Sequence, residues 1–106
     1  MLVTTSEFIA GRTITAHLGL AKGNTIRARH VGRDIIALLR TLVGGEIQEY
    51  TKLMAEAREQ ALDRMINHAH AMGADAIINV RFSTSVVLGG AAELLAYGTA
   101  VTLSSE

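Results

Sequence analysis

The sequence contains no cysteine, which excludes a disulfide framework, a thiolate zinc site and a cysteine nucleophile. It also lacks an excess of either charge, because ten basic residues balance ten acidic ones. A neutral chain has no global positive field for non-specific binding to nucleic acid or to an anionic membrane. Only 4% of the residues are aromatic and could stack on bases. Nucleic acid is therefore the least favoured partner.

The chain also lacks the features of a secretory signal or a membrane span. Its first residues have neither the basic start nor the long apolar core of a signal peptide. The longest nearly uncharged region, 82–101, carries Glu93 near its middle and alternates like a strand. We expect a cytoplasmic protein with no membrane partner. A length of 106 residues predicts one domain over 1–106. Such a short chain buries a smaller fraction of its surface than a larger protein, which favours oligomerisation.

Period-two alternation predicts strands in the first part of the chain. Residues 12–20 alternate apolar and polar side chains, which predicts one buried face. That face comprises Ile14, Ala16, Leu18 and Leu20. Residues 2–5 are the expected short partner of this strand. Gly23-Asn24 is a turn signal, after which the chain either turns or continues the strand through a bulge.

Helical periodicity follows, and then a second pair of strands. We expect a first helix over 34–43, a connection at Gly44-Gly45 and a second helix over 46–72 that ends at Gly73. The last two strands span 75–87 and 93–103. Ile78, Val80 and Phe82 are expected on one face of the former, and Gly89-Gly90 forms the hairpin between them. This order predicts an α+β fold, a mainly antiparallel sheet with two helices inserted between N-terminal and C-terminal strand pairs.

Short motifs of a known family recur along the whole chain. They are Val3-Thr4-Thr5, 27–30, 32–34, 44–46, Tyr50, 73–76, 79–82 and 96–101. On these residues the sequence resembles the YbjQ-like family of small bacterial and archaeal proteins. The resemblance implies a dodecin-subunit-like fold, a ring-shaped homopentamer and a heavy-metal-binding label, with no assigned activity.

Histidines are the natural metal ligands in a chain without cysteine. His68 and His70 cannot chelate one ion from a helix, because residues two apart point about 200° apart. A ring presents each histidine several times, so a site shared between subunits is open to His17, His30 and His68. A divalent ion held by imidazole and carboxylate groups is the candidate cofactor.

A second set of residues suggests a different ligand. Arg27, His30 and Glu46 could line a small-molecule or enzyme pocket between subunits. The competing interpretation is that the basic residues over 27–33 form ion pairs with glutamates. No set of residues has the arrangement of a known active site, so we assign no catalytic residue. We expect a ring-forming homo-oligomeric binding module, with the small-molecule pocket or enzyme as the alternative.

Overall fold

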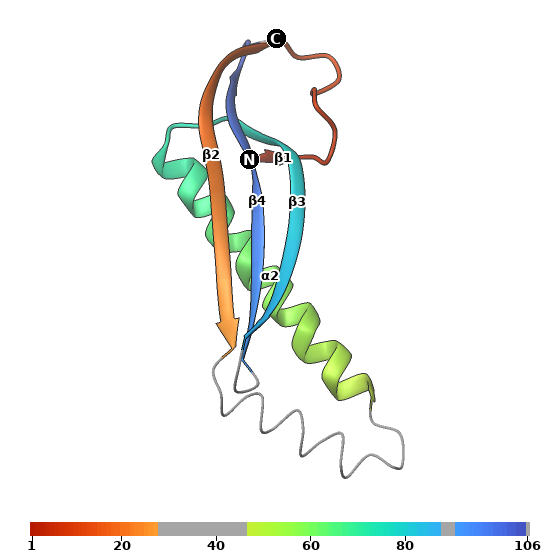
Figure 1. Ribbon diagram of the computed structural model, residues 1–106. Helices are drawn as coiled ribbons and strands as arrows, with labels where there is room; N and C mark the ends of the chain where they lie inside the picture. Colours follow the sequence, from red (N-terminus) through yellow and green to blue (C-terminus); the bar gives the residue numbers. More distant parts are fainter. Residues whose placement is uncertain (28–46, 88–90, 106) are drawn as a thin grey trace.

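The computed structural model describes residues 1–27, 47–87 and 91–105, and these form an α+β arrangement (Figure 1). The predicted helix over 34–43, Gly44-Gly45 and the Gly89-Gly90 connection lie outside the described residues. The described elements are β1 (Leu2–Val3), β2 (Ile14–Arg27), α2 (Ile47–Ala71), β3 (Ala76–Val87) and β4 (Ala91–Leu103). The predicted order of strands, helix and strands is confirmed over these ranges.

The four strands form one mixed sheet in the order β1-β3-β4-β2. The three long strands are antiparallel neighbours, which confirms the predicted pairing of 75–87 with 93–103. The pairing of β2 with β4 was not predicted, and β1 runs parallel to β3. The expected pairing of residues 2–5 with 12–20 is wrong, because Leu2 pairs with Ala76 and Val3 with Ile77. Backbone hydrogen bonds continue this pairing with β3, because Thr4 N–H donates to the carbonyl of Ile77 and Val80 N–H donates to the carbonyl of Thr4, both at 3.0 Å.

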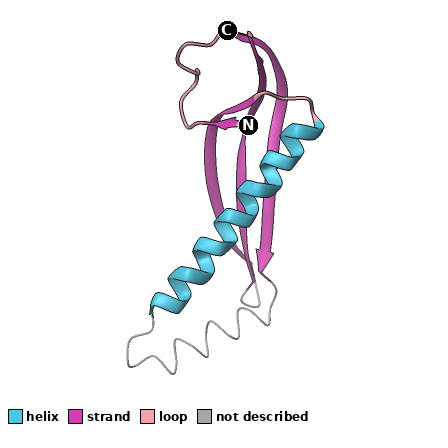
Figure 2. Ribbon diagram, turned by 180° about the vertical axis from the view of Figure 1, so that it is seen from behind, coloured by secondary structure: helices cyan, strands magenta, loops and turns pink. Residues whose placement is uncertain are grey.

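Helix α2 crosses one face of the sheet diagonally (Figure 2). It buries residues spaced four apart, which is the periodicity that predicted it. These residues are Ala57, Ala61, Met65 and Ala69. Gly73 follows the helix with a φ of 83°, and its N–H donates to the carbonyl of His70 at 3.0 Å. Gly73 therefore ends the helix as predicted, in the left-handed conformation that glycine adopts without strain.

Strand β2 runs straight through Gly23, where the helix lies on the strand. A Cβ at Gly23 would lie 2.6 Å from the carbonyl carbon of Arg64, and closer still to Met65 N and Ala61 O. Of the two alternatives, a turn or a continued strand, the strand continues. The expected bulge is not at Gly23-Asn24, because the register shifts of β2 lie earlier, at 14–16 and 17–19. Gly23 is therefore a contact point for the helix backbone and not a turn residue.

The expected buried face of β2 is wrong beyond its first residues. Leu20 is 56% exposed, whereas Ala21 and Thr25 are buried against the helix. Two register shifts, between Ile14 and Ala16 and between His17 and Gly19, each place one extra residue in the strand. Because side chains alternate with a period of two, the first extra residue moves Ala16 to the face opposite Ile14. The second returns Leu20 to the face of Ile14, which no described segment covers at Leu20.

A similar irregularity divides β3 between two cores. Asn79 has a φ of 53° within the register shift between 78 and 81, so Ile77 and Val80 both contact the helix-side core. Ile78 belongs to a second cluster on the opposite face, and Phe82 is 47% exposed. The prediction that Ile78, Val80 and Phe82 share one face is therefore wrong, because Ile78 and Val80 lie on opposite faces of the sheet. The second cluster also contains Ala76, Val101 and Leu103, covered by Ile9 and Ile14.

The remainder of the face opposite α2 is covered by no segment in the described part of the chain. We call it the open face. It comprises Leu20, Lys22, Asn24, Arg81, Glu93, Leu95 and Tyr97, which alternate with the residues buried under the helix. Among the described helices, none is long and apolar enough to cross a membrane.

Candidate ligand pocket at the edge of the sheet

Two side chains of α2 bind the outer edge of β2. Arg64 Nη1 donates to the carbonyl oxygen of Asn24 at 2.6 Å, and the backbone N–H of Lys22 donates to His68 Nδ1 at 3.1 Å. Arg64 and His68 are four residues apart, so the helix presents both to the same strand. They satisfy backbone groups that an edge strand otherwise leaves open to pairing with another chain.

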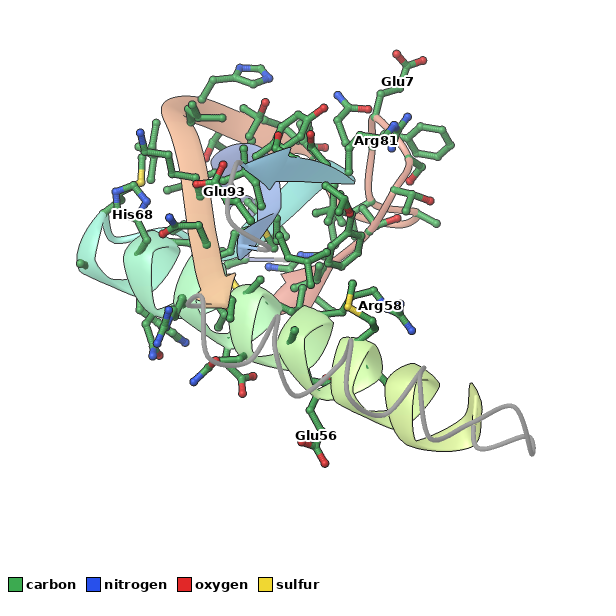
Figure 3. All side chains as sticks on the ribbon, turned by 60° about the horizontal axis from the view of Figure 1, so that its bottom comes forward. Glu7, Glu56, Arg58, His68, Arg81 and Glu93 are labelled. Atoms are coloured by element: carbon green, nitrogen blue, oxygen red, sulfur yellow. The ribbon has the colours of Figure 1, made fainter. Side chains whose placement is uncertain are left out.

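Beside this edge lies a pocket of about 340 Å³. Its size is within the range of small-molecule sites, which begins at roughly 300 Å³. It is lined by Lys22, Asn24, His68, Glu93 and Leu95. Figure 3 shows His68 beside β2 and Glu93 among the strands. These residues lie far apart in the sequence. They meet at one site because β2 pairs with β4 and also contacts α2.

The hydrogen bond at His68 determines which ring nitrogen carries a proton. Nδ1 accepts from the Lys22 backbone and must keep its lone pair. In the neutral ring the proton is then on Nε2, which becomes a donor. Protonation of the ring would place a hydrogen on Nδ1 and remove this contact with β2. His68 therefore offers the pocket a donor while it holds the strand edge.

Glu93 supplies the acceptor of the pocket. Its Oε2 accepts from Asn24 Nδ2 at 3.1 Å, which fixes the carboxylate beside β2. Lys22 contributes a cation on the same open face, and no ion pair to Lys22 is found within the described ranges. The pocket thus combines a cation and an N–H donor with a carboxylate acceptor, next to the apolar side chain of Leu95.

The residues predicted to form sites are not gathered by the described structure. His30 and Glu46 lie outside the described residues, and Arg27 is the last residue of β2. His17 is exposed in β2 opposite Val101 and does not line the pocket. His68 is the one predicted residue that lies in it. The proposed roles of the other residues stay predictions.

The described residues do not fit a metal ion. Nowhere in 1–27, 47–87 and 91–105 do three His, Cys, Asp or Glu side chains gather around a common point. Within the pocket, Nδ1 of His68 is already engaged and Nε2 carries the proton, so neither nitrogen is free to ligate without breaking the bond to β2. The nearby Lys22 ammonium also repels a cation.

Sequence reasoning missed four of the five pocket residues. Asn24 and Glu93 carried a signal, because polar and acidic residues are depleted in strands, yet both stand inside strand-like segments. Lys22 and Leu95 carried no such signal in the sequence, since their place in the pocket depends on the register between β2 and β4.

Comparison with known proteins identifies the family. A family model described as "Putative heavy-metal-binding", YbjQ_1, matches residues 1–104. The chain belongs to the YbjQ-like family. A UPF0145 protein of Methanosarcina acetivorans is 56% identical over 106 residues, with 100% of both chains covered. The UPF0145 protein of Archaeoglobus fulgidus is 55% identical, covering 97% of this chain and 95% of its own.

The fold of this YbjQ-like chain is also similar to a solved structure. A protein of unknown function of the DUF74 family, from Pediococcus pentosaceus, superposes with a TM-score of 0.57. The match covers 98% of each chain at 19% sequence identity. At this identity the likeness shows the fold alone.

Proposed function

We propose that this YbjQ-like chain is a ring-forming homo-oligomeric binding module, with five subunits as the family resemblance implies. The shape of the subunit is the observation that carries the proposal. Its radius of gyration is 17.1 Å and its longest extent is 54 Å. A compact domain of this length has a radius of gyration of about 13 Å. A subunit this extended leaves a large surface that the described part of its own chain does not cover.

The exposed area supports association. The chain exposes 6747 Å² at a mass of 11.3 kDa. Compact monomers of this mass expose about 5,700 Å², so the excess is about 1,000 Å². This excess is comparable to the roughly 800 Å² that each partner buries in a standard protein interface. We infer that the occupant of the excess surface is a second copy of the chain.

The charges of the two faces favour a head-to-tail contact. Apart from the pocket residues Lys22 and Glu93, the open face carries Arg81, whereas the exposed acidic residues of α2, Glu56, Glu59 and Asp63, outnumber its exposed Arg58 and Arg64. Figure 3 shows Glu56 pointing away from the sheet. If the open face of one subunit meets the helix of the next, opposite charges are brought together. Such heterologous contacts close into rings when the rotation between subunits permits.

Light scattering coupled to size exclusion tests the assembly. The wild-type chain should elute at about five times 11.3 kDa at micromolar concentration, without added ligand. Leu20→Arg, on the open face, should release monomers, because the charge would be buried unpaired in the interface. Phe8→Arg is the matched control, since Phe8 is 61% exposed outside this face. A wild-type monomer would refute the ring, and an intact ring in Leu20→Arg would refute this interface.

A metal role remains a weaker candidate, suggested by the description of the family model. Divalent ions would need ligands from more than one subunit, drawn from His17, His30 and His68, as the sequence predicts. Titration of Zn(II), Ni(II) and Cd(II) into untagged protein tests it. Binding that is lost when one of these histidines is changed to alanine would support a shared site. Tight cadmium binding that survives all three changes would contradict it.

A further inference from the structure

We propose that the pocket formed by Lys22, Asn24, His68, Glu93 and Leu95 binds a small zwitterion with a carboxylate and an ammonium group, the chemistry of a free amino acid. The pocket is built within one chain, so this inference goes beyond the proposed ring and does not depend on it. It follows from the opposite charges that the pocket presents.

The anionic end of the ligand would bind Lys22 and His68. The Lys22 side chain is a cation without an ion-pair partner among the described residues. His68 donates through Nε2, because its Nδ1 accepts from the Lys22 backbone. A carboxylate accepts from both groups in charge-assisted hydrogen bonds, which are about twice as strong as neutral ones.

The cationic end of the ligand would bind Glu93. Asn24 donates to Oε2 of this carboxylate at 3.1 Å, and a carboxylate has about four lone-pair sites, so acceptor capacity remains for an ammonium group. Leu95 gives the pocket an apolar wall suited to a short carbon chain between the two charged ends.

The same residues disfavour the simpler ligands. Glu93 repels phosphate or any other ligand that is only an anion, and Lys22 repels a bare metal ion. An amine without a carboxylate leaves Lys22 and His68 unpaired. Only a ligand with both charges satisfies both sides of the pocket, so binding should require both groups on one molecule.

Calorimetry with a series of amino acids tests the proposal. The probes are glycine, β-alanine, 4-aminobutanoate and 5-aminopentanoate, which differ in the spacing of the charges, with butanoate, butylamine and Zn(II) for comparison. At least one amino acid should bind with a Kd of about 1 mM or tighter, and at least tenfold more tightly than either singly charged analogue. Absence of binding by the whole series at about 20 mM would overturn the proposal, as would Zn(II) binding in its place.

Two isosteric variants separate the ends of the ligand. Glu93→Gln should weaken the amino acid at least tenfold and remove its advantage over butanoate, whereas Lys22→Met should remove its advantage over butylamine. Glu7→Gln is the control, since Glu7 lies in the N-terminal segment away from the pocket (Figure 3). Equal binding to all three variants would refute the assignment.

Two further measurements complete the test. Nitrogen NMR of labelled histidine should show an unprotonated Nδ1 and a protonated Nε2 in His68, and the opposite tautomer would overturn the donor role. Light scattering on the same samples separates this inference from the proposed ring. Binding by a monomer would retain the pocket and refute the ring, and a ring that binds no amino acid would refute the pocket alone.

Discussion

Replacing Gly23 with alanine is the most direct test of how α2 packs on the sheet. The new Cβ would lie 2.6 Å from the carbonyl carbon of Arg64 and nearer still to Met65 N and Ala61 O. All three are backbone atoms of the helix, so no side-chain rotation relieves the contact. The helix would have to move away from β2 by about 1 Å to restore ordinary carbon contacts of 3.5 to 4.0 Å.

The expected cost follows from this displacement. Overpacking of a filled core typically costs about 1 to 3 kcal/mol. Here the displaced helix also loses contact between Ala61 and Met65 and the sheet, so we expect a loss of about 3 kcal/mol or more in the free energy of unfolding. At roughly 4 to 8 °C per kcal/mol for a domain of this size, the melting temperature should fall by at least about 12 °C.

The sign of the effect makes the experiment decisive. In a strand without the helix contact, Gly→Ala stabilises by about 0.4 to 1 kcal/mol, because it restricts the unfolded chain. Urea denaturation followed by circular dichroism measures the difference. Gly11→Ala is the control, since Gly11 has open space around it and a φ of 78°, which costs only about 1 to 2 kcal/mol. A Gly23→Ala variant as stable as the wild type would refute the close approach of the helix.

Two smaller changes test the interior and the end of the sheet. Thr25→Val should raise stability by about 1 kcal/mol in urea denaturation, because the Thr25 hydroxyl is buried and has no hydrogen-bond partner among residues 1–27, 47–87 and 91–105. Destabilisation would show that a partner exists. Asp75→Ala should cost about 1 to 2 kcal/mol, because Asp75 Oδ2 accepts from the backbone N–H of Leu103 at 2.9 Å. Asp75→Asn keeps an acceptor and should recover at least half of that loss, and equal losses in the two variants would argue against this hydrogen bond.

The long helix could be predicted from the sequence because its signal is local. Ala57, Ala61, Met65 and Ala69 repeat at the helical period, and Gly73 supplies a terminator. The existence of the three long strands and the antiparallel pairing of β3 with β4 could be predicted for the same reason. Each of these features depends on residues close together in the sequence.

The faces of the strands could not be predicted, because a single irregular residue reverses them. The two extra residues of β2, within 14–16 and 17–19, and the positive φ of Asn79 leave no distinct trace in an alternating sequence. The partner of β1 was missed because a two-residue strand has too little pattern to select its neighbour. In both cases tertiary contacts decide what the local sequence leaves open.

The candidate site was harder to predict than the fold, since its residues come from three elements. His68 was selected as a candidate metal ligand, yet its Nδ1 accepts from the strand edge, a role that depends on where the helix crosses β2. Lys22 and Glu93 belong to strands whose register brings them to one pocket. Such a constellation is visible only after the sheet is assembled.

The packing of α2 also explains why both proposals concern the same side of the sheet. The helix packs on small residues of the sheet, among them Ala96 and Ala100, and at Gly23 its backbone comes so close that a Cβ would not fit. Strand residues alternate, so the larger and charged side chains of β2 and β4 are left on the opposite face. Leu20 and Tyr97 thereby become available to a neighbouring subunit, and Lys22 and Glu93 to a ligand. A close helix contact on one face thus creates the surface for recognition on the other.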